Sequence, residues 1–173
     1  MEIKIERQTL TYPITTEIVG ESIMLLNIVF NLPEFQTELS GQKFYCSNRP
    51  SFCNNAGEIL GTDVYDDFMS KELIVINLSV KNLVNPWRRF ISKTFGATDI
   101  NGNLIVTYTW WLSQNNQKEL IIEYATHIGH EIFHTEYFKY IHNPEIGNKH
   151  FDNDKDVTYK IDEIIEKLIR KQY

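Results

Sequence analysis

Residues 118–142 read KELIIEYATHIGHEIFHTEYFKYIH, a stretch with no proline and a single glycine that predicts a long amphipathic helix. Apolar residues recur in it at helical spacing and should form one buried stripe: Leu120, Ile121, Tyr124, Ala125, Ile128 and Ile132. Polar residues 113–116 precede the stretch, where an N-terminal cap is expected. Asn143 and Pro144 follow it, and the residue before a proline disfavours the helical conformation. The helix is therefore predicted to span 118–142.

Within this stretch, residues 130–134 form the pattern His-Glu-Ile-Phe-His. Residues four apart on a helix lie about 40° apart around its axis, so His130 and His134 can direct both imidazoles at one point. Neutral imidazoles are good ligands for Zn²⁺, and Glu131 beside them can accept a proton from a metal-bound water. The pattern predicts a zinc site with His130 and His134 as ligands and Glu131 as general base. The alternative is a metal-free helix that carries these residues by coincidence.

Three further residues on the same predicted helix need an interpretation. Glu123 and His127 lie on the same side of the predicted helix as His130 and His134. Three interpretations of these two residues are open: outer partners of the site, ligands of an alternative site, or polar lining of a cleft. A carboxylate-bridged site in a helical bundle is disfavoured, because the sequence lacks a second Glu-x-x-His helix. Glycine inside a helix costs roughly 1 kcal/mol relative to alanine. Gly129 therefore indicates either a backbone or substrate passing close by or a tolerated defect.

Composition places the chain among globular proteins and disfavours two kinds of partner. Its 173 residues suit one domain, expected to span 1–173, and 42% of them are hydrophobic. A net charge of −6 disfavours binding to nucleic acid through phosphate contacts. No stretch approaches about 18 consecutive apolar residues, so no membrane span is expected. The first residues lack the apolar region of a secretion signal, so cytoplasmic localisation is the default expectation, with export if a signal has been trimmed.

The two cysteines, Cys46 and Cys53, allow two interpretations. Their spacing does not match a Cys-x-x-Cys zinc knuckle, and there is no second pair. Free thiols in a reducing cytosol are the favoured prediction. A local disulfide that closes a short loop is the alternative, expected if the protein is exported.

The remaining sequence alternates strand and helix signals. Strands are predicted at 2–10, 72–80 and 104–112, and helices at 16–30, 87–95 and 156–171. The segment 32–67, rich in Asn, Ser, Gly and Pro, is predicted to be mostly loop, with short pieces of structure around 44–46, and 96–103 to be turns. This order predicts an α+β fold in which helices cover a small mixed β-sheet.

The segment from about Gly96 to His150 resembles the zincin metallopeptidases, which carry a His-Glu-x-x-His pentad on an active-site helix preceded by a strand. The strand would be 104–112 and the pentad 130–134. In that superfamily the strand borders the cleft and can pair with the substrate backbone. The resemblance implies a zincin-like α+β fold, with a small mixed sheet packed against the active-site helix and flanking helices. The nearest subgroup is the SprT-like group, in which a third histidine follows the pentad.

The chain departs from the zincin subgroups in several places. Metzincins need Gly at the third position after the pentad and His three further on, where this chain has Tyr137 and Tyr140, so that group is excluded. A cysteine zinc ribbon of the kind that SprT-like proteins often add is absent from the sequence. No Glu-x-x-x-Asp element of the usual gluzincin type stands clearly downstream. The third ligand is therefore not fixed by the motif alone.

Several residues after the pentad are candidates for that third ligand. By the SprT-like resemblance His150 ranks first, since it lies 20 residues after His130 in a loop that could return under the helix. Asp152, Asp154 and Asp156 rank next, because one carboxylate oxygen would complete a His-His-Asp site, and Glu163 is more distant. His142, at the predicted helix end, is expected to line the cleft or to cap the helix.

These residues predict a zinc-dependent metallopeptidase, a hydrolase that acts on a peptide or protein substrate. Bound zinc lowers the pKa of its water towards about 7, and Glu131 would accept the proton as the water attacks a peptide carbonyl. Candidate donors to the oxyanion are Tyr137, Tyr140, Tyr159, His127 and His142. The alternative is a non-catalytic zinc-binding regulatory or interaction protein that retains a zincin-like fold. An intact Glu131 favours the enzyme, because a structural site needs no base.

Overall fold

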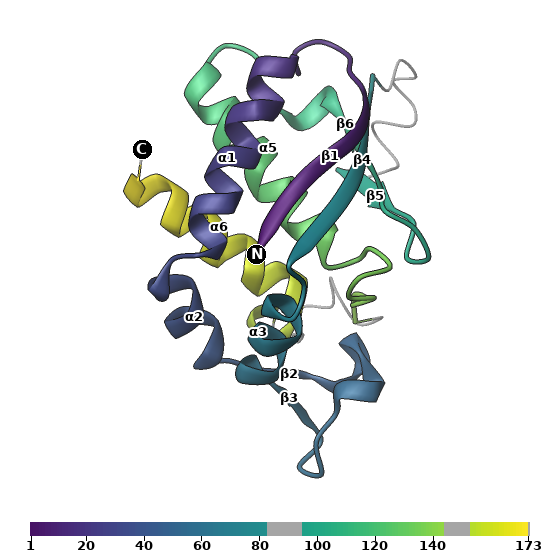
Figure 1. Cartoon of the computed structure of the whole chain (residues 1–173), viewed down its shortest axis with the longest axis vertical. Coiled ribbons are helices and arrows are strands. Elements are labelled where there is room, and N and C mark those ends of the chain that lie inside the picture. Colours follow the sequence, from purple (N-terminus) through teal and green to yellow (C-terminus); the bar gives the residue numbers. More distant parts are fainter. Residues whose placement is uncertain (83–94, 144–152, 173) are drawn as a thin grey trace.

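A mixed β-sheet forms one layer of the fold, and α1 (Thr16–Phe30) and α5 (Gln117–Ile132) pack against one of its faces (Figure 1). The third long helix, α6 (Val157–Gln172), lies across α5 and α1. This computed structural model describes residues 1–82, 95–143 and 153–172. The predicted α+β layout with a small mixed sheet is confirmed for these residues.

The sheet in the described part of the chain has the strand order β1-β4-β6-β5. Its strands are β1 (Glu2–Thr9), β4 (Leu73–Lys81), β5 (Gly96–Thr98) and β6 (Leu104–Tyr108). β1 and β6 flank β4 in parallel, whereas β5 runs antiparallel to β6 at the edge. Alternate residues of β4 are buried against the helices: Ile74, Ile76, Leu78 and Val80. This period of two is the reason that the strand was predictable from its β-branched sequence.

The helices predicted at 16–30 and 156–171 are confirmed as α1 and α6, the second shifted by one residue at each end. The Thr15 side chain accepts a hydrogen bond from the Ile18 backbone N–H and caps α1. Both helices bury an apolar face, which in α6 includes Ile161, Ile165 and Leu168. The predicted helix at 87–95 lies almost wholly outside the described residues.

Segment 32–67 was predicted to be mostly loop, which is wrong, although the short piece predicted around 44–46 coincides with β2 (Lys43–Tyr45). It contains α2 (Pro33–Ser40), β2 (Lys43–Tyr45), two short 3₁₀ turns, β3 (Glu58–Leu60) and most of α3 (Gly61–Met69). Each short helix buries two apolar side chains four residues apart, Phe35 with Leu39 in α2 and Val64 with Phe68 in α3. Two turns of helix give too little periodicity to be recognised beside so many turn-forming residues. The buried ring contacts, such as Phe30 with Phe68 at 4.6 Å between centroids, stabilise these helices.

The cysteines are joined in a disulfide, so the favoured prediction of free thiols is wrong. The Cα atoms of Cys46 and Cys53 lie 5.0 Å apart and close a loop of two 3₁₀ turns, Cys46–Asn48 and Pro50–Phe52. Sequence spacing does not reveal such a pairing, because it depends on how the intervening residues fold back.

Helix α5 ends at Ile132, ten residues before the predicted end, and the chain then turns back on itself. The hydroxyl of Thr135 donates to the Ile132 carbonyl at 2.6 Å, and the Tyr140 N–H donates to the Phe133 carbonyl at 2.9 Å. On a continued helix, Phe133 and Phe138 would lie about 140° apart around the axis. In the turn, both rings are fully buried and lie 5.2 Å apart. Aromatic burial therefore outweighs the helical tendency of this segment.

The strand predicted at 104–112 is also shorter than expected. The predicted strand 104–112 ends at Tyr108, and Thr109–Trp111 form a 3₁₀ turn. The segment 96–103, predicted to be turns, begins with β5, which forms the edge of the sheet. β5 packs closely on α5. Gly96 shows how close the two elements are, since a Cβ at this position would lie 2.4 Å from Cε1 of His127 in α5.

Among the described helices, none is by itself long and apolar enough to cross a membrane, although α1 and α2 together, bent by 67°, meet the length and composition required.

Gly129 is explained by close packing between helices. A Cβ at this position would lie 2.3 Å from Cδ1 of Ile165 in α6 and 3.1 Å from Cδ2 of Leu26 in α1. The nearest atoms belong to side chains and not to a passing backbone. The glycine lets α6 approach the turn of α5 that carries His130.

We expect Gly129→Ala to be less stable than Gly20→Ala by about 1–3 kcal/mol, the usual cost of overpacking a core. Gly20 is the matched control, because it is also helical but exposed, and a Cβ there would have no atom within 4 Å. Gly20→Ala should stabilise the protein by about 0.5–1 kcal/mol through helix propensity. Urea denaturation of both variants measures the difference. Equal free energies of unfolding would show that Ile165 moves aside without cost.

Candidate metal centre

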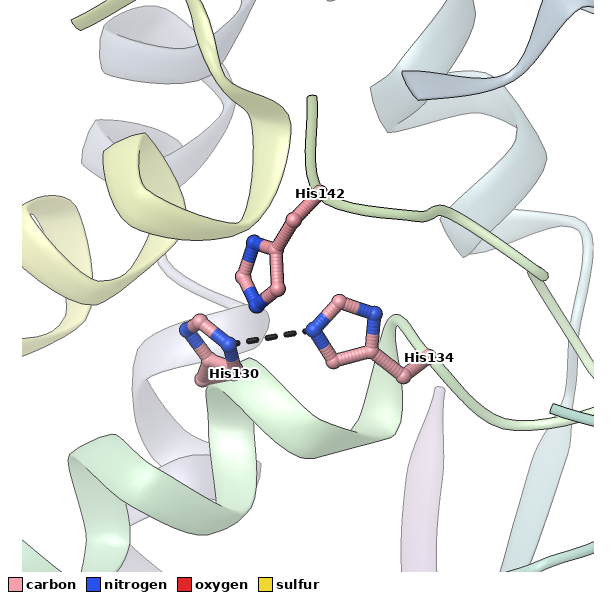
Figure 2. A group of neighbouring side chains, drawn as sticks. All are labelled: His130, His134 and His142. Atoms are coloured by element: carbon pink, nitrogen blue, oxygen red, sulfur yellow. Dashed lines mark hydrogen bonds between the residues drawn. The ribbon is translucent and has the colours of Figure 1, made fainter. Parts of the chain in front are cut away.

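Three histidines converge at the end of α5 (Figure 2). His130 belongs to the last turn of the helix, His134 to the turn that follows, and His142 to the segment returning from it. Their ligand nitrogens all lie within 4.8 Å of one another, and the Nε2 atoms of His130 and His134 are 3.1 Å apart. In a tetrahedral zinc site with Zn–N bonds of about 2.05 Å, two ligand nitrogens lie about 3.3 Å apart. The three histidines are therefore close enough to hold a metal ion.

Each imidazole is oriented by a contact at its other nitrogen, Nδ1. His130 Nδ1 donates to Oδ2 of Asp162 at 2.9 Å, and His134 Nδ1 donates to the Tyr140 carbonyl at 2.7 Å. His142 Nδ1 lies 3.2 Å from the Thr158 hydroxyl oxygen. Such contacts fix the tautomer and leave the Nε2 lone pair free for a metal. In Figure 2 one ring nitrogen of His142 accordingly faces the other two rings.

Asp156 lies on the Nδ1 side of the His142 ring. Its Oδ1 lies 3.7 Å from His142 Nδ1 and accepts a hydrogen bond from the Thr158 hydroxyl at 2.9 Å. Asp156 is fully buried, and burial alone would raise its pKa. The nearby His142 imidazole and the hydrogen bonds from Thr158, Asn143 and Asn48 outweigh burial and hold the pKa well below its usual range. Asp156 therefore remains a carboxylate beside the His142 ring.

The surroundings shift the pKa values of His130 and His134 in opposite directions. Burial would lower the pKa of His130, but the charge and hydrogen bond of Asp162 raise it to about 9. Burial and then the charge on His130 lower the pKa of His134 to about 4. Metal binding at these two histidines would be in competition with protons and would therefore weaken as the pH falls.

Glu131 lies beside the histidines on the wall of the same cleft. Its Oε2 accepts a hydrogen bond of 2.6 Å from the hydroxyl of Thr98 in β5, and its Oε1 lies 3.8 Å from Nδ1 of His127. Burial, and then the charge on His130, lower the pKa of His127 to about 3, so this imidazole is neutral. Glu131 is thus held between the edge strand and α5, and it is available for proton transfer.

The cleft is large enough to admit a peptide. Its volume is about 860 Å³, and the three histidines, Glu131, Tyr159 and Asp162 line it. His142 is exposed, and His134 is half-buried, so solvent reaches the histidines. Apolar side chains, Phe95 and Ile141, are exposed on the wall of the cleft. The centre is therefore an open site, as a catalytic metal requires.

The candidates for the third ligand have different outcomes. His150 and Asp152 lie outside the described residues. Asp154 and Glu163 are exposed and are not part of the histidine cluster, and Glu163 pairs with Lys160. Asp156 lies behind His142 instead of beside the other two histidines. Within the described residues, His142 completes the group, whereas the sequence predicted it to line the cleft or cap a helix.

The other candidate residues around the histidines fall into two groups: those that the sequence suggested and those that it did not. Tyr137 bonds through its hydroxyl to the backbone of Val75 in β4, away from the histidines. Tyr159 is the best-placed tyrosine, with its ring centroid 5.2 Å from that of His142. Glu123 accepts two hydrogen bonds from Ser113, one from its backbone and one from its hydroxyl. Asp162 and Thr98 were not predicted, because no local sequence pattern links them to the pentad.

Comparisons with protein-family profiles, with curated proteins and with solved structures find no match to this chain.

Proposed function

We propose that this protein is a zinc-dependent metallopeptidase of zincin-like fold. His130, His134 and His142 would hold the ion, and Glu131 would act as general base. The observation that carries the proposal is the convergence of three Nε2 atoms, each with Nδ1 oriented by the protein, beside a carboxylate in an open cleft. The edge strand β5 lines the cleft, in place of the strand 104–112 that was expected to border it, and the backbone of a peptide substrate could pair with β5 there.

The donor set agrees with zinc. Three imidazoles with an open cleft beside them match the three-ligand pattern of catalytic zinc sites. Zinc bound there would supply an activated water and would polarise a carbonyl. Glu131 would accept the water's proton and deliver it to the leaving amine. Thr98 would orient Glu131 through its hydrogen bond, and Tyr159, whose ring lies beside His142 in the cleft, would be the candidate donor to the oxyanion.

The test is hydrolysis of an unfolded protein by material purified without a histidine tag. We expect about one zinc per chain by elemental analysis and cleavage of denatured casein. A chelator such as 1,10-phenanthroline should abolish cleavage, and added zinc should restore it, because the metal supplies the activated water. Cleavage that persists after complete removal of the metal would rule out the proposal. Zinc binding without cleavage of any unfolded substrate would favour the non-catalytic alternative.

A further inference from the structure

The loop closed by the Cys46–Cys53 disulfide lies against the segment that carries His142. Asn48, inside the loop, is fully buried, whereas Cys53 is exposed to solvent. The backbone N–H of Ile141 donates to the Asn48 carbonyl at 2.8 Å, and Nδ2 of Asn48 donates to the Ile141 carbonyl at 2.8 Å. Asn48 thus bonds both backbone groups of the residue directly before His142.

The same loop also contacts the residue directly after His142. Nδ2 of Asn143 donates to the hydroxyl oxygen of Ser47 at 2.6 Å. The loop therefore holds His142 on both sides through Ser47 and Asn48. These contacts join residues more than ninety positions apart in the sequence.

Asn48 also holds the carboxylate that supports His142. Its Nδ2 donates to Oδ2 of Asp156 at 2.7 Å, and the Asn143 backbone N–H donates to the same oxygen at 3.2 Å. The Asn48 side chain thus bonds both the carbonyl of Ile141, directly before His142, and the Asp156 carboxylate beside His142. Contacts of this kind around a metal site commonly contribute 10- to 100-fold in metal affinity.

We propose that the Cys46–Cys53 loop positions His142 through Ser47 and Asn48, so that the metal affinity of the three-histidine site falls when the disulfide is reduced. The inference rests on the proposed metal site, but it does not require that the site hydrolyses peptides. Without the disulfide, the loop would have more conformations available to it, so holding Asn48 against Ile141 would cost more conformational entropy.

Reduction by a water-soluble phosphine gives a balanced reaction. The S–S bond breaks and each sulfur gains a hydrogen from water, while the phosphine takes the water's oxygen and becomes a phosphine oxide. Dithiols would also reduce the bond, but they bind zinc and would obscure the measurement. A phosphine is therefore the reductant of choice.

The experiment measures the Kd for Zn²⁺ by competition with a chromophoric chelator. We expect the Kd to rise by about 10- to 100-fold on reduction of the wild type, in the double variant C46S/C53S, and in Asn48→Ala. The double variant has no thiols that could bind zinc, and its Kd should not respond to the phosphine. Asn48→Ala keeps the disulfide and tests the contact itself.

Asn27→Ala is the matched control. Asn27 likewise bonds both backbone groups of one residue, Ile3, through its side chain, but it joins α1 to β1 away from the histidines. Both asparagine variants should lower the thermal midpoint, whereas only Asn48→Ala should weaken zinc binding. An unchanged Kd in both Asn48→Ala and the reduced wild type would overturn the inference.

The same data separate this inference from the proposed function. A wild type that binds no zinc would remove the metal site and the inference with it. A wild type that binds zinc but cleaves nothing would end the peptidase proposal, and a redox-dependent Kd would then still support the loop's role.

Discussion

Glu131→Gln is expected to lower peptide hydrolysis by about 10²–10⁴-fold, the usual contribution of a general base, while the zinc content stays at the wild-type value. Glutamine has the shape of glutamate and can still accept the hydrogen bond from Thr98, so the cleft should keep its geometry. It cannot take a proton from water. Steady-state cleavage of a fluorogenic protein substrate, with elemental analysis of the same sample, measures both quantities.

Glu136→Gln is the control for this experiment. Glu136 lies five residues after Glu131, just beyond the end of α5, and is the same kind of residue, but its side chain is exposed and does not line the cleft. Its replacement should change the rate by no more than a few-fold. A Glu131→Gln variant that keeps full activity would show that another group accepts the proton, and the assignment of the base would be wrong.

His142→Ala is expected to weaken zinc binding by more than the 10- to 100-fold that loss of an outer contact costs, because a ligand itself is removed. Hydrolysis at low zinc should fall with the metal content. His150→Ala is the informative partner, since resemblance to SprT-like proteins predicts His150 as the third ligand. We expect that variant to bind zinc as the wild type does. Zinc titrations of the two variants decide between the two histidines, and loss of binding only in His150→Ala would contradict the assignment of His142.

Local patterns in the sequence were sufficient to predict the long helices and strands and the pairing of His130 with His134. The alternation of β4 and the capped apolar stripe of α1 depend on neighbours within a few residues, and both were predicted closely. The pairing of His130 with His134 follows from helix geometry alone. His134 lies just beyond the end of α5, but the last turn is tight enough to keep the two rings together.

The second half of the site could not be predicted, because it depends on contacts between distant segments. The burial of Phe138 and Tyr140 turns the chain after Ile132, and only that turn returns His142 to the helix. Once residues 118–142 were assigned to one helix, His142 was placed on its far end. The disulfide and the loop it closes lie almost a hundred residues earlier, and no local signal connects them to the histidines.

The absent side chain at Gly129 has a consequence for recognising relatives of this protein. Because α6 rests directly on that turn, Asp162 can reach His130, so the glycine before the pentad and the aspartate on the last helix should change together or not at all. A homologous chain would then share the arrangement Gly-His-Glu-x-x-His, a histidine eight positions on, and an aspartate twenty positions after that. This spaced signature is longer and more selective than the pentad, and it could be searched for in genomes directly.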